Sequence, residues 1–242
     1  MKLLFLIPPS EGKNTGGEPG KEYLQHTFEK PYEIIKSVTE KDLKCIGKRF
    51  EEGMLLNKLL CDHRVETEVH SAMERYTGVM YNAINYQELS NKGRIFFDNH
   101  FGILSGMYGL ISPEDTIGNY KLPIETKGLI QFWKETISHR ITQNNYDYII
   151  NLLPLSYMKM VDWKKLDTPI LNINFLTEKN GKIQKVSHGV KKIKGEWIHN
   201  TVEKLGNRDP VSHIQEILES SGGEISKEKS GNISTLEIFI GE

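Results

Sequence analysis

The chain has 242 residues, of which 38% are apolar and 26% are charged, and its formal net charge is −1. This composition is ordinary for a globular protein and leaves enough apolar residues for a real core. The near-neutral charge excludes attraction of a polyanion by the molecule as a whole, so any nucleic-acid site must be a local patch.

The two cysteines, Cys45 and Cys61, match no zinc or redox spacing. A reduced cytosolic compartment is therefore expected, and the protein is predicted to be cytoplasmic. Near the N-terminus only five apolar residues precede two prolines, a run too short for the core of a signal peptide. No stretch approaches the ~18 apolar residues of a membrane helix, so we expect no membrane partner.

The first elements alternate between an apolar run, a loop and helical patterns. Residues 3–7 form a continuous apolar run closed by Pro8 and predict a buried strand. The glycine- and proline-rich segment up to Gly20 is expected to be a loop. Helices are predicted over residues 32–38 and 49–60. The second helix is expected to carry Phe50, Met54, Leu55 and Leu59 on one face.

The middle of the chain predicts further helices and short strands. Residues 71–90 show a helical pattern, and residues 94–97 (Arg-Ile-Phe-Phe) predict a strand. Residues 101–106 are interpreted as a strand followed by a turn. Residues 109–123 are rich in Gly, Pro, Asp and Asn and predict an extended surface loop. A helix is expected over residues 127–143.

The last third predicts most of a sheet. Residues 148–153 and 170–176 are typical of buried strands, and residues 182–187 predict a hairpin partner across Asn180-Gly181. A final strand is expected over residues 234–240.

Two helices complete this part, near residues 192–205 and 211–220. Strands mixed with helices and a hairpin favour an α/β fold of the α+β type, a mixed sheet with surrounding helices, over a clean doubly wound fold. No internal repeat or low-complexity linker is present, so residues 1–242 are predicted to form a single compact domain.

The loop Pro8-Pro9-Ser10-Glu11-Gly12-Lys13 is the first candidate site. Ser10 supplies a hydroxyl, Lys13 a cation, and the neighbouring glycines let backbone amides approach a ligand closely. An anion such as phosphate would suit this set, although the spacing is not that of a P-loop. The composition alone favours the alternative, a mobile solvated loop.

A basic segment is the second candidate site. Residues 159–194 contain nine lysines and three acidic residues, a local excess of six positive charges, with Lys191, Lys192 and Lys194 as its densest part. The i, i+3 spacing of Lys191 and Lys194 places them on one helix face, where they could contact phosphates in a salt-sensitive way. The alternative is a solvated lysine-rich surface.

Two further features carry weaker indications. Residues 39–60 form two short helices around Gly47 and predict a helix-hairpin-helix-like element, although any helical pair looks similar. Tyr76-Thr77-Gly78 and the segment Ser105-Gly106-Met107-Tyr108-Gly109 predict tight turns that face a cleft, or alternatively packed tyrosines.

Conventional catalytic and cofactor motifs find little support. The eight histidines show no diagnostic ligand spacing, so no metal site is predicted. The chain contains no Gly-x-Ser-x-Gly elbow and no dinucleotide-binding fingerprint, and no cofactor is evident.

Short motifs recur along nearly the whole chain in an order that a known family shares. They occupy residues 6–13, 76–78, 104–110 with Pro113 and Asp115, 120–122, 131–133, 150–152, 157–159, 179–182 and 191–195. On these motifs the chain resembles the YaaA family of bacterial peroxide-stress proteins.

The resemblance implies a cytosolic protein that limits intracellular free iron and oxidative DNA damage under hydrogen peroxide. It also implies an α/β fold with a central positively charged cleft and a helix-hairpin-helix element, to which DNA binding is attributed. The matching element would be residues 39–60, and the cleft lysines would be Lys13, Lys191, Lys192 and Lys194.

Two departures from the family pattern matter. One branch of the family has Ser-Pro-Ala-Lys-Thr after the first strand, where this chain has the longer Pro-Pro-Ser-Glu-Gly-Lys. The family also often carries a Ser and a Glu where this chain has Pro154 and Ser156. An activity that needs that carboxylate is therefore in question here.

Three functional hypotheses follow. In the first, a monomer binds double-stranded DNA through Lys191, Lys192 and Lys194, with Tyr76 or Tyr108 stacking on a base. In the second, an enzyme acts on a small anionic or nucleotide-like substrate in the same cleft.

The anion binders or acid/base groups of that enzyme would include Ser10, Lys13, Asn151 and the 191–194 lysines, beside the hydroxyl-bearing turn residues Tyr76, Thr77, Ser105 and Tyr108. The third hypothesis, a dedicated iron protein, is disfavoured because no ligand cluster is evident. A shared cavity for the first loop and the lysines would favour a ligand site.

Overall fold

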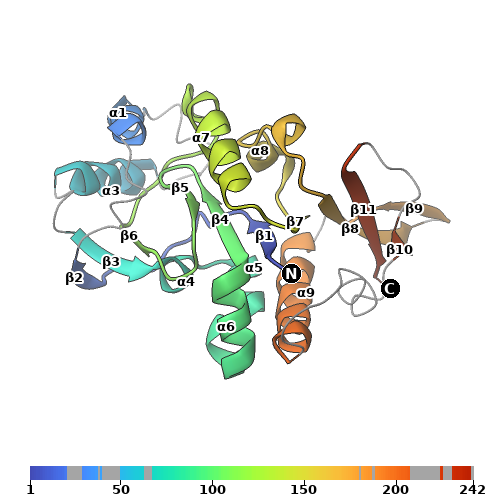
Figure 1. Cartoon of the computed structure of the whole chain (residues 1–242). Helices are drawn as coiled ribbons and strands as arrows, with labels where there is room; N and C mark the ends of the chain where they lie inside the picture. The colour runs from blue at the N-terminus through green and yellow to red at the C-terminus, as the bar shows by residue number, and fades with distance from the viewer. Residues whose placement is uncertain are drawn as a thin grey trace.

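A mixed sheet organises the molecule in the computed structural model (Figure 1). The structure describes residues 1–20, 29–37, 39, 50–62, 67–179, 181–186, 189–207, 224–225 and 231–240. The sheet has eight strands in the order β10-β11-β8-β7-β1-β4-β5, and β9 pairs with β8. These strands are β1 (Leu3–Ile7), β4 (Phe101–Ser105), β5 (Gly109–Ile111), β7 (Tyr148–Asn151), β8 (Ile170–Lys179), β9 (Lys182–Lys185), β10 (Glu224–Ile225) and β11 (Ile233–Phe239).

The strand β1 lies in the interior of this sheet, between β4 and β7, and runs parallel to both. Its central residue Phe5 pairs with Phe101 on one side and with Ile150 on the other. All five residues of β1 are buried, which explains why it is a continuous apolar run rather than an alternating one. The strands β5, β9 and β10 add antiparallel edges, so the predicted mixed sheet is confirmed.

Helices cover both faces of the sheet (Figure 1). They are α1 (Glu29–Ser37), α3 (Phe50–Asp62), α4 (Ala72–Arg75), α5 (Val79–Ile84), α6 (Asn91–His100), α7 (Leu129–Gln143), α8 (Leu155–Met158) and α9 (Val190–Gly206). Figure 1 shows α7 and α8 above the sheet and α6 and α9 below it. A small second sheet joins β2 (Glu18–Gly20), β3 (Thr67–Ser71) and β6 (Thr116–Ile117).

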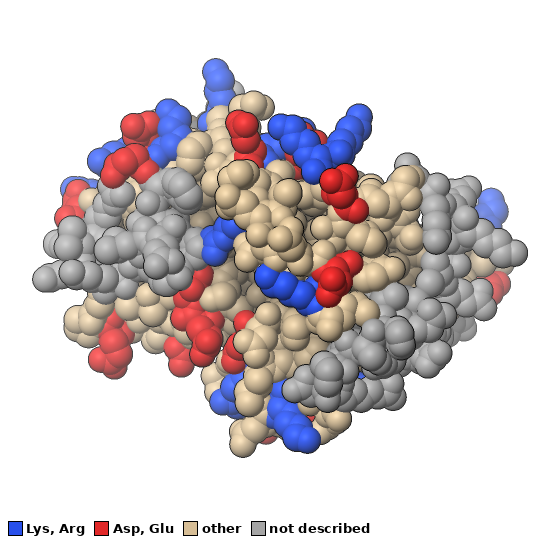
Figure 2. All heavy atoms as spheres, viewed as in Figure 1, with Lys and Arg blue, Asp and Glu red and all other residues tan. Residues whose placement is uncertain are grey.

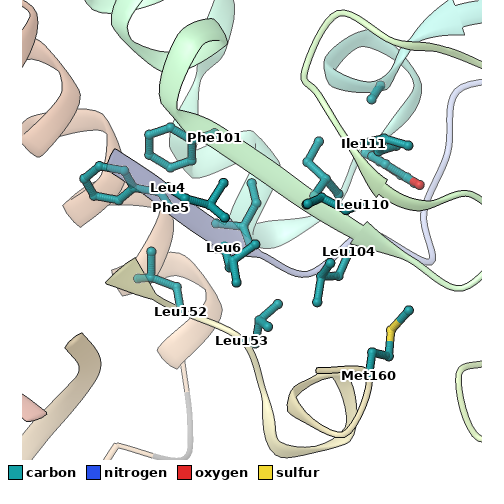
Figure 3. Packing of buried hydrophobic residues seen from close by; sticks show 14 of the residues in the cluster. Leu4, Phe5, Leu6, Phe101, Leu104, Leu110, Ile111, Leu152, Leu153 and Met160 are labelled. Carbon is teal, nitrogen blue, oxygen red and sulfur yellow. The ribbon is translucent and has the colours of Figure 1, made fainter. Parts of the chain in front are cut away.

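The core lies around β1. Figure 3 shows Phe5 of this strand facing Phe101 of β4, with Leu152 beyond the end of β7 close by. The rings of Phe5 and Phe101 stack at a centroid distance of 4.6 Å and an angle of 10°. The buried side chains pack β1, β4 and β7 against one another. The loops that follow these strands begin at this packed core.

The strand predicted for residues 94–97 is wrong, because these residues lie inside α6. Ser90 caps this helix, and its Oγ accepts a hydrogen bond from Gly93 N at 3.1 Å. Phe96 and Phe97 are buried while Ile95 is 61% exposed, a spacing that suits one buried face of a helix. The run of adjacent apolar residues suggested a strand, but Ser90 is an N-cap residue and already indicates that a helix begins before this run.

The helical pattern over residues 71–90 breaks into short pieces. Ser71 ends β3 and forms a capping box with Glu74 at the start of α4. Gly78 has φ 107°, which separates α4 from α5. Asn85 adopts a left-handed conformation with φ 48° and ends α5.

Residues 109–123 are not the surface loop that their composition predicts. They form β5 and β6 and bury Ile111, Ile117 and Tyr120. Tyr108 contributes to this packing because its hydroxyl accepts a hydrogen bond from Gly118 N at 3.1 Å. Internal hydrogen bonds therefore satisfy a backbone that the sequence suggested was solvated.

The helix expected over residues 49–60 is α3, but its apolar face is not turned to the core. Met54, Leu55 and Leu59 of α3 are exposed, whereas Asn57 and Leu60 are buried. The polar residue Asn57 therefore lies on the buried side of this helix. Residues 40–49 of the predicted helix-hairpin-helix element, Gly47 among them, and the helix near residues 211–220 lie outside the described residues.

The loop expected up to Gly20 ends in the short strand β2, whereas several other expected elements are confirmed. The helix predicted over residues 127–143 is α7, and the helix near 192–205 is α9. The hairpin across residues 180–181 joins β8 and β9, and the last predicted strand is β11. None of the helices in the described part of the chain is both long and apolar enough to cross a membrane.

Candidate functional site

A cavity of about 610 Å³ opens where three parallel strands end. The 8–13 loop follows β1, Gly106 follows β4, and Pro154, Ser156 and Tyr157 follow β7. Residues 78–81, residues 120–125 and Lys191 complete the wall. Because β4 and β7 flank β1 on opposite sides, this is the point of an α/β sheet where ligands commonly bind.

The 8–13 loop is held by backbone hydrogen bonds to the segment between α4 and α5. Lys13 forms an antiparallel bridge with Tyr76, and Thr77 N donates to Gly12 O at 2.9 Å. The Ser10 hydroxyl donates to the Thr77 carbonyl oxygen. The mobile, solvated loop that the composition favoured is therefore replaced by an anchored one.

Gly12 allows the 8–13 loop to lie close to Thr77. A Cβ at Gly12 would lie 2.8 Å from Thr77 Oγ1, closer than real contacts allow. The sequence suggested that the glycines admit a ligand. At this position the absent side chain instead lets the 8–13 loop approach its own neighbour.

Lys13 places its ammonium end against neutral groups. Its Nζ donates to Ser10 O at 2.9 Å and lies 4.2 Å from the centroid of the Tyr120 ring. Burial, followed by the neighbouring Lys121 cation, lowers the pKa of Lys13 well below its ordinary value of 10.5, against the opposing effect of Glu11. Lys13 therefore loses its proton more readily than an ordinary surface lysine.

A chain of hydroxyl groups lies behind Lys13. The Tyr120 hydroxyl is 2.8 Å from the Tyr76 hydroxyl and 2.7 Å from Ser105 Oγ. Ser105 Oγ also accepts hydrogen bonds from Met107 N and Tyr108 N, both at 3.1 Å. Burial raises the pKa of Tyr76, so its hydroxyl stays protonated and acts within the network as a neutral group.

Tyr76 and Tyr108, on which a base was expected to stack, are both buried in the structure. The two residues are 2% and 1% exposed, and neither lines the cavity. Tyr76 and Ser105 act instead through Tyr120, which does line the cavity.

Lys121 is a cavity residue that the sequence analysis missed. It is only 8% exposed, and its Nζ donates to the Glu11 carbonyl oxygen of the 8–13 loop. Asn57 of α3 holds its backbone through two hydrogen bonds of 2.8 Å, one to the Lys121 N–H and one to its C=O. The only sequence signal was its place in a family motif within a segment interpreted as surface loop.

The basic segment contributes one lysine to the cavity rather than three. Lys191 lines the wall. Lys194 donates from Nζ to Leu152 O at 2.7 Å, and burial lowers its pKa to about 8. Lys192 is exposed and lies 3.4 Å from Glu196, so the structure does not bring Lys192 or Lys194 into the cavity wall.

Asn151 has a structural contact at the end of β7. Its side chain donates to Asn172 Oδ1 at 2.8 Å and accepts from Leu153 N at 3.0 Å. It is buried and does not line the cavity, whereas Pro154 and Ser156 do. The two departures from the family pattern therefore fall in the cavity wall.

Charges in the cavity wall are unevenly placed. Lys13, Lys121 and Lys191 face two carboxylates, Glu11 and Glu125, both of which belong to exposed residues. Cations thus outnumber carboxylates in the wall, and two of the three lysines are at least partly buried. Among the described residues no group of three or more His, Cys, Asp or Glu side chains is placed to hold a metal ion.

Comparison with known proteins agrees with the resemblance in the motifs. Residues 3–220 match the family model described as "Peroxide stress protein YaaA". A UPF0246 protein of Rickettsia bellii is 29% identical over 181 residues, covering 71% of this chain and 73% of its own. A UPF0246 protein of Crocosphaera subtropica is 27% identical over 180 residues, covering 69% and 72%. With the family model spanning nearly its whole length, the chain belongs to the YaaA family of peroxide stress proteins.

Proposed function

We propose that this chain serves in the response to peroxide stress by binding a small anionic, nucleotide-like ligand in the cavity at the ends of β1, β4 and β7. One observation carries the proposal: Lys13, Lys121 and Lys191 come from distant parts of the chain and line one cavity. Converging lysines are a common means of holding phosphate or carboxylate groups.

The dimensions of the cavity support a small ligand. Its volume of about 610 Å³ is typical of sites for metabolites and cofactors. Pro8, Leu122 and Ile124 give apolar wall beside the lysines, as expected for a ligand with both an apolar and an anionic part.

Duplex DNA binding, which the family resemblance implies, is the second candidate. The exposed lysines at positions 159, 164, 165, 191 and 192 favour it, since phosphates would meet them at the surface. Figure 2 shows basic and acidic side chains interspersed over one face, without a continuous basic surface there. For this reason we rank the small ligand above the duplex.

A limit on free iron would then be an indirect effect of the bound ligand or of the reaction that it undergoes. The described residues offer no cluster of metal-binding side chains to hold iron directly. Stoichiometric iron in the purified protein would contradict this part of the proposal.

A thermal-shift panel tests the small-ligand proposal. Wild type and the Lys191→Met variant are heated with inorganic phosphate, pyrophosphate and nucleoside mono-, di- and triphosphates. At 100 times its Kd a ligand stabilises the folded state by about 2.7 kcal/mol. We expect at least one compound to stabilise the wild type and to lose most of that effect in Lys191→Met.

Lys192→Met is the matched control, because Lys192 is exposed and paired with Glu196 outside the cavity wall. It should keep the wild-type response. No stabilisation by any compound, or equal loss in both variants, would contradict the small-ligand proposal. A duplex oligonucleotide whose affinity falls steeply with salt and with Lys192→Met would instead favour the second candidate.

A further inference from the structure

Lys13, which is partly buried, lacks the carboxylate partner that a lysine withdrawn from water normally has. Buried ammonium groups are usually paired with a carboxylate. Among the described residues no carboxylate lies within ion-pair distance of Lys13 Nζ, which contacts the Ser10 carbonyl and the faces of the Tyr120 and Tyr76 rings. The neighbouring cation Lys121 repels a positive charge on Lys13 and so lowers its pKa further.

The backbone around Lys13 is fixed on both sides. The bridge to Tyr76 holds Lys13 itself, and Asn14 N donates to Arg75 O at 2.8 Å. Lys13 lines the cavity, so a ligand bound there would lie beside this positioned side chain. A lysine that is desolvated and placed beside another cation is an activated nucleophile, because its uncharged form predominates at lower pH.

We infer that Lys13 is a covalent catalytic residue whose amine forms a Schiff base with an anion-bearing aldehyde or ketone in this cavity. The inference rests on the proposed anion site, in which Lys121 and Lys191 hold the anionic group while the carbonyl carbon reaches Lys13. A Schiff base requires the ligand to be an aldehyde or a ketone. The proposed function alone requires only that the ligand is anionic.

The step balances without an added oxidant or reductant. The lone pair of the uncharged Lys13 amine forms a C–N bond to the carbonyl carbon, and the π electron pair moves to oxygen, which gains a proton as nitrogen loses one. Loss of water from this carbinolamine forms the imine. The sum is amine plus carbonyl compound giving imine plus water.

Trapping with pyridoxal 5′-phosphate and borohydride tests the inference. This probe carries an aldehyde and a phosphate, and borohydride reduces the imine to a stable secondary amine that peptide mass spectrometry locates. Each unit by which the pKa falls raises the uncharged fraction of a lysine at neutral pH about tenfold. We expect Lys13 to be labelled at pH 7 at least about tenfold faster than the exposed Lys192.

The Lys121→Met variant adds a readout that a purely structural role would not change. With pyridoxal, which carries no phosphate for Lys121 to hold, removing this neighbouring cation should raise the pKa of Lys13 and move its labelling profile to higher pH, with the rate recovered at alkaline pH. Lys13→Arg keeps a cation at the position and should give no adduct there.

Pyridoxal, which lacks the phosphate, distinguishes the reactive amine from the anion site. If it labels Lys13 as selectively and as fast as the phosphorylated probe does, the reactive amine stands and the anion site fails. If inorganic phosphate competes with the phosphorylated probe for binding but Lys13 gives no adduct, the anion site stands and the covalent role is overturned. Labelling of wild-type Lys13 no faster than of Lys192 at pH 7 also overturns the inference.

Discussion

At the scale of single residues, Tyr120 connects the cavity to the core. Its ring lies beneath the Lys13 ammonium group, and its hydroxyl joins Tyr76 to Ser105. Tyr76 and Ser105, two of the hydroxyl-bearing residues that the sequence singled out, therefore share one network with Tyr120. Of these three, only Tyr120, which the sequence did not single out as a site residue, lines the cavity. Such a buried network is stable only while every member keeps a partner.

We expect the Tyr120→Phe substitution to destabilise the fold. It removes the hydroxyl that Tyr76 and Ser105 share while leaving the ring beneath Lys13 in place. A buried polar group that loses its partner costs about 1–3 kcal/mol. Urea denaturation measures the change in the free energy of unfolding.

Tyr148→Phe provides the control, because this half-buried hydroxyl bonds to no described residue. Its free energy of unfolding should stay within about 0.5 kcal/mol of the wild-type value. Equal effects of the two substitutions would show that the Tyr120 hydroxyl adds nothing to the network.

At the scale of secondary-structure elements, Lys194 ties α9 to the end of β7. Its Nζ donates to Leu152 O, and burial lowers its pKa to about 8 from the ordinary 10.5. The sequence predicted this lysine as a phosphate contact on the same helix face as Lys191. The helical spacing was available from the sequence, but the packing of Gly195 against Met80 decides which way the helix faces.

The lowered pKa of Lys194 makes stability depend on pH. Between about pH 8 and pH 10.5 the unfolded chain binds more protons at this residue than the folded one, so the free energy of unfolding rises with pH. The slope from one lysine is at most about 1.4 kcal/mol per pH unit. Urea denaturation at pH 7, 8.5 and 10 should show a smaller rise in Lys194→Met than in the wild type.

Lys192→Met serves again as the control on the same helix and should keep the wild-type slope, since Lys192 is exposed. An unchanged slope in Lys194→Met would mean that Lys194 keeps an ordinary pKa in the folded protein.

Elements with a strong local signal were predictable, and those that depend on distant partners were not. The apolar run of β1 and the hairpin between β8 and β9 are fixed by nearby residues. The burial of Lys121 depends on Asn57, far away in the chain, and the anchoring of the 8–13 loop depends on residues 74–77. No local pattern encodes contacts of that kind.

At the scale of the whole molecule, strand order creates the site. Parallel pairing places the ends of β1, β4 and β7 at one edge of the sheet, and α9 adds Lys191 there. The buried apolar residues form a cluster spanning both sides of β1, consistent with one core. The single-domain organisation and the monomeric state stay predictions.

Hydrogen–deuterium exchange with and without pyrophosphate or ADP shows whether the cavity is the binding site. We expect peptides covering residues 8–14, 120–125 and 154–157 to gain protection together, because these distant segments line one cavity. A peptide covering β11, which lies beyond β7 and β8 in the sheet, should not change. Protection confined to the exposed lysines at 159–165, or no protection at 8–14, would contradict the claim that the cavity is the binding site.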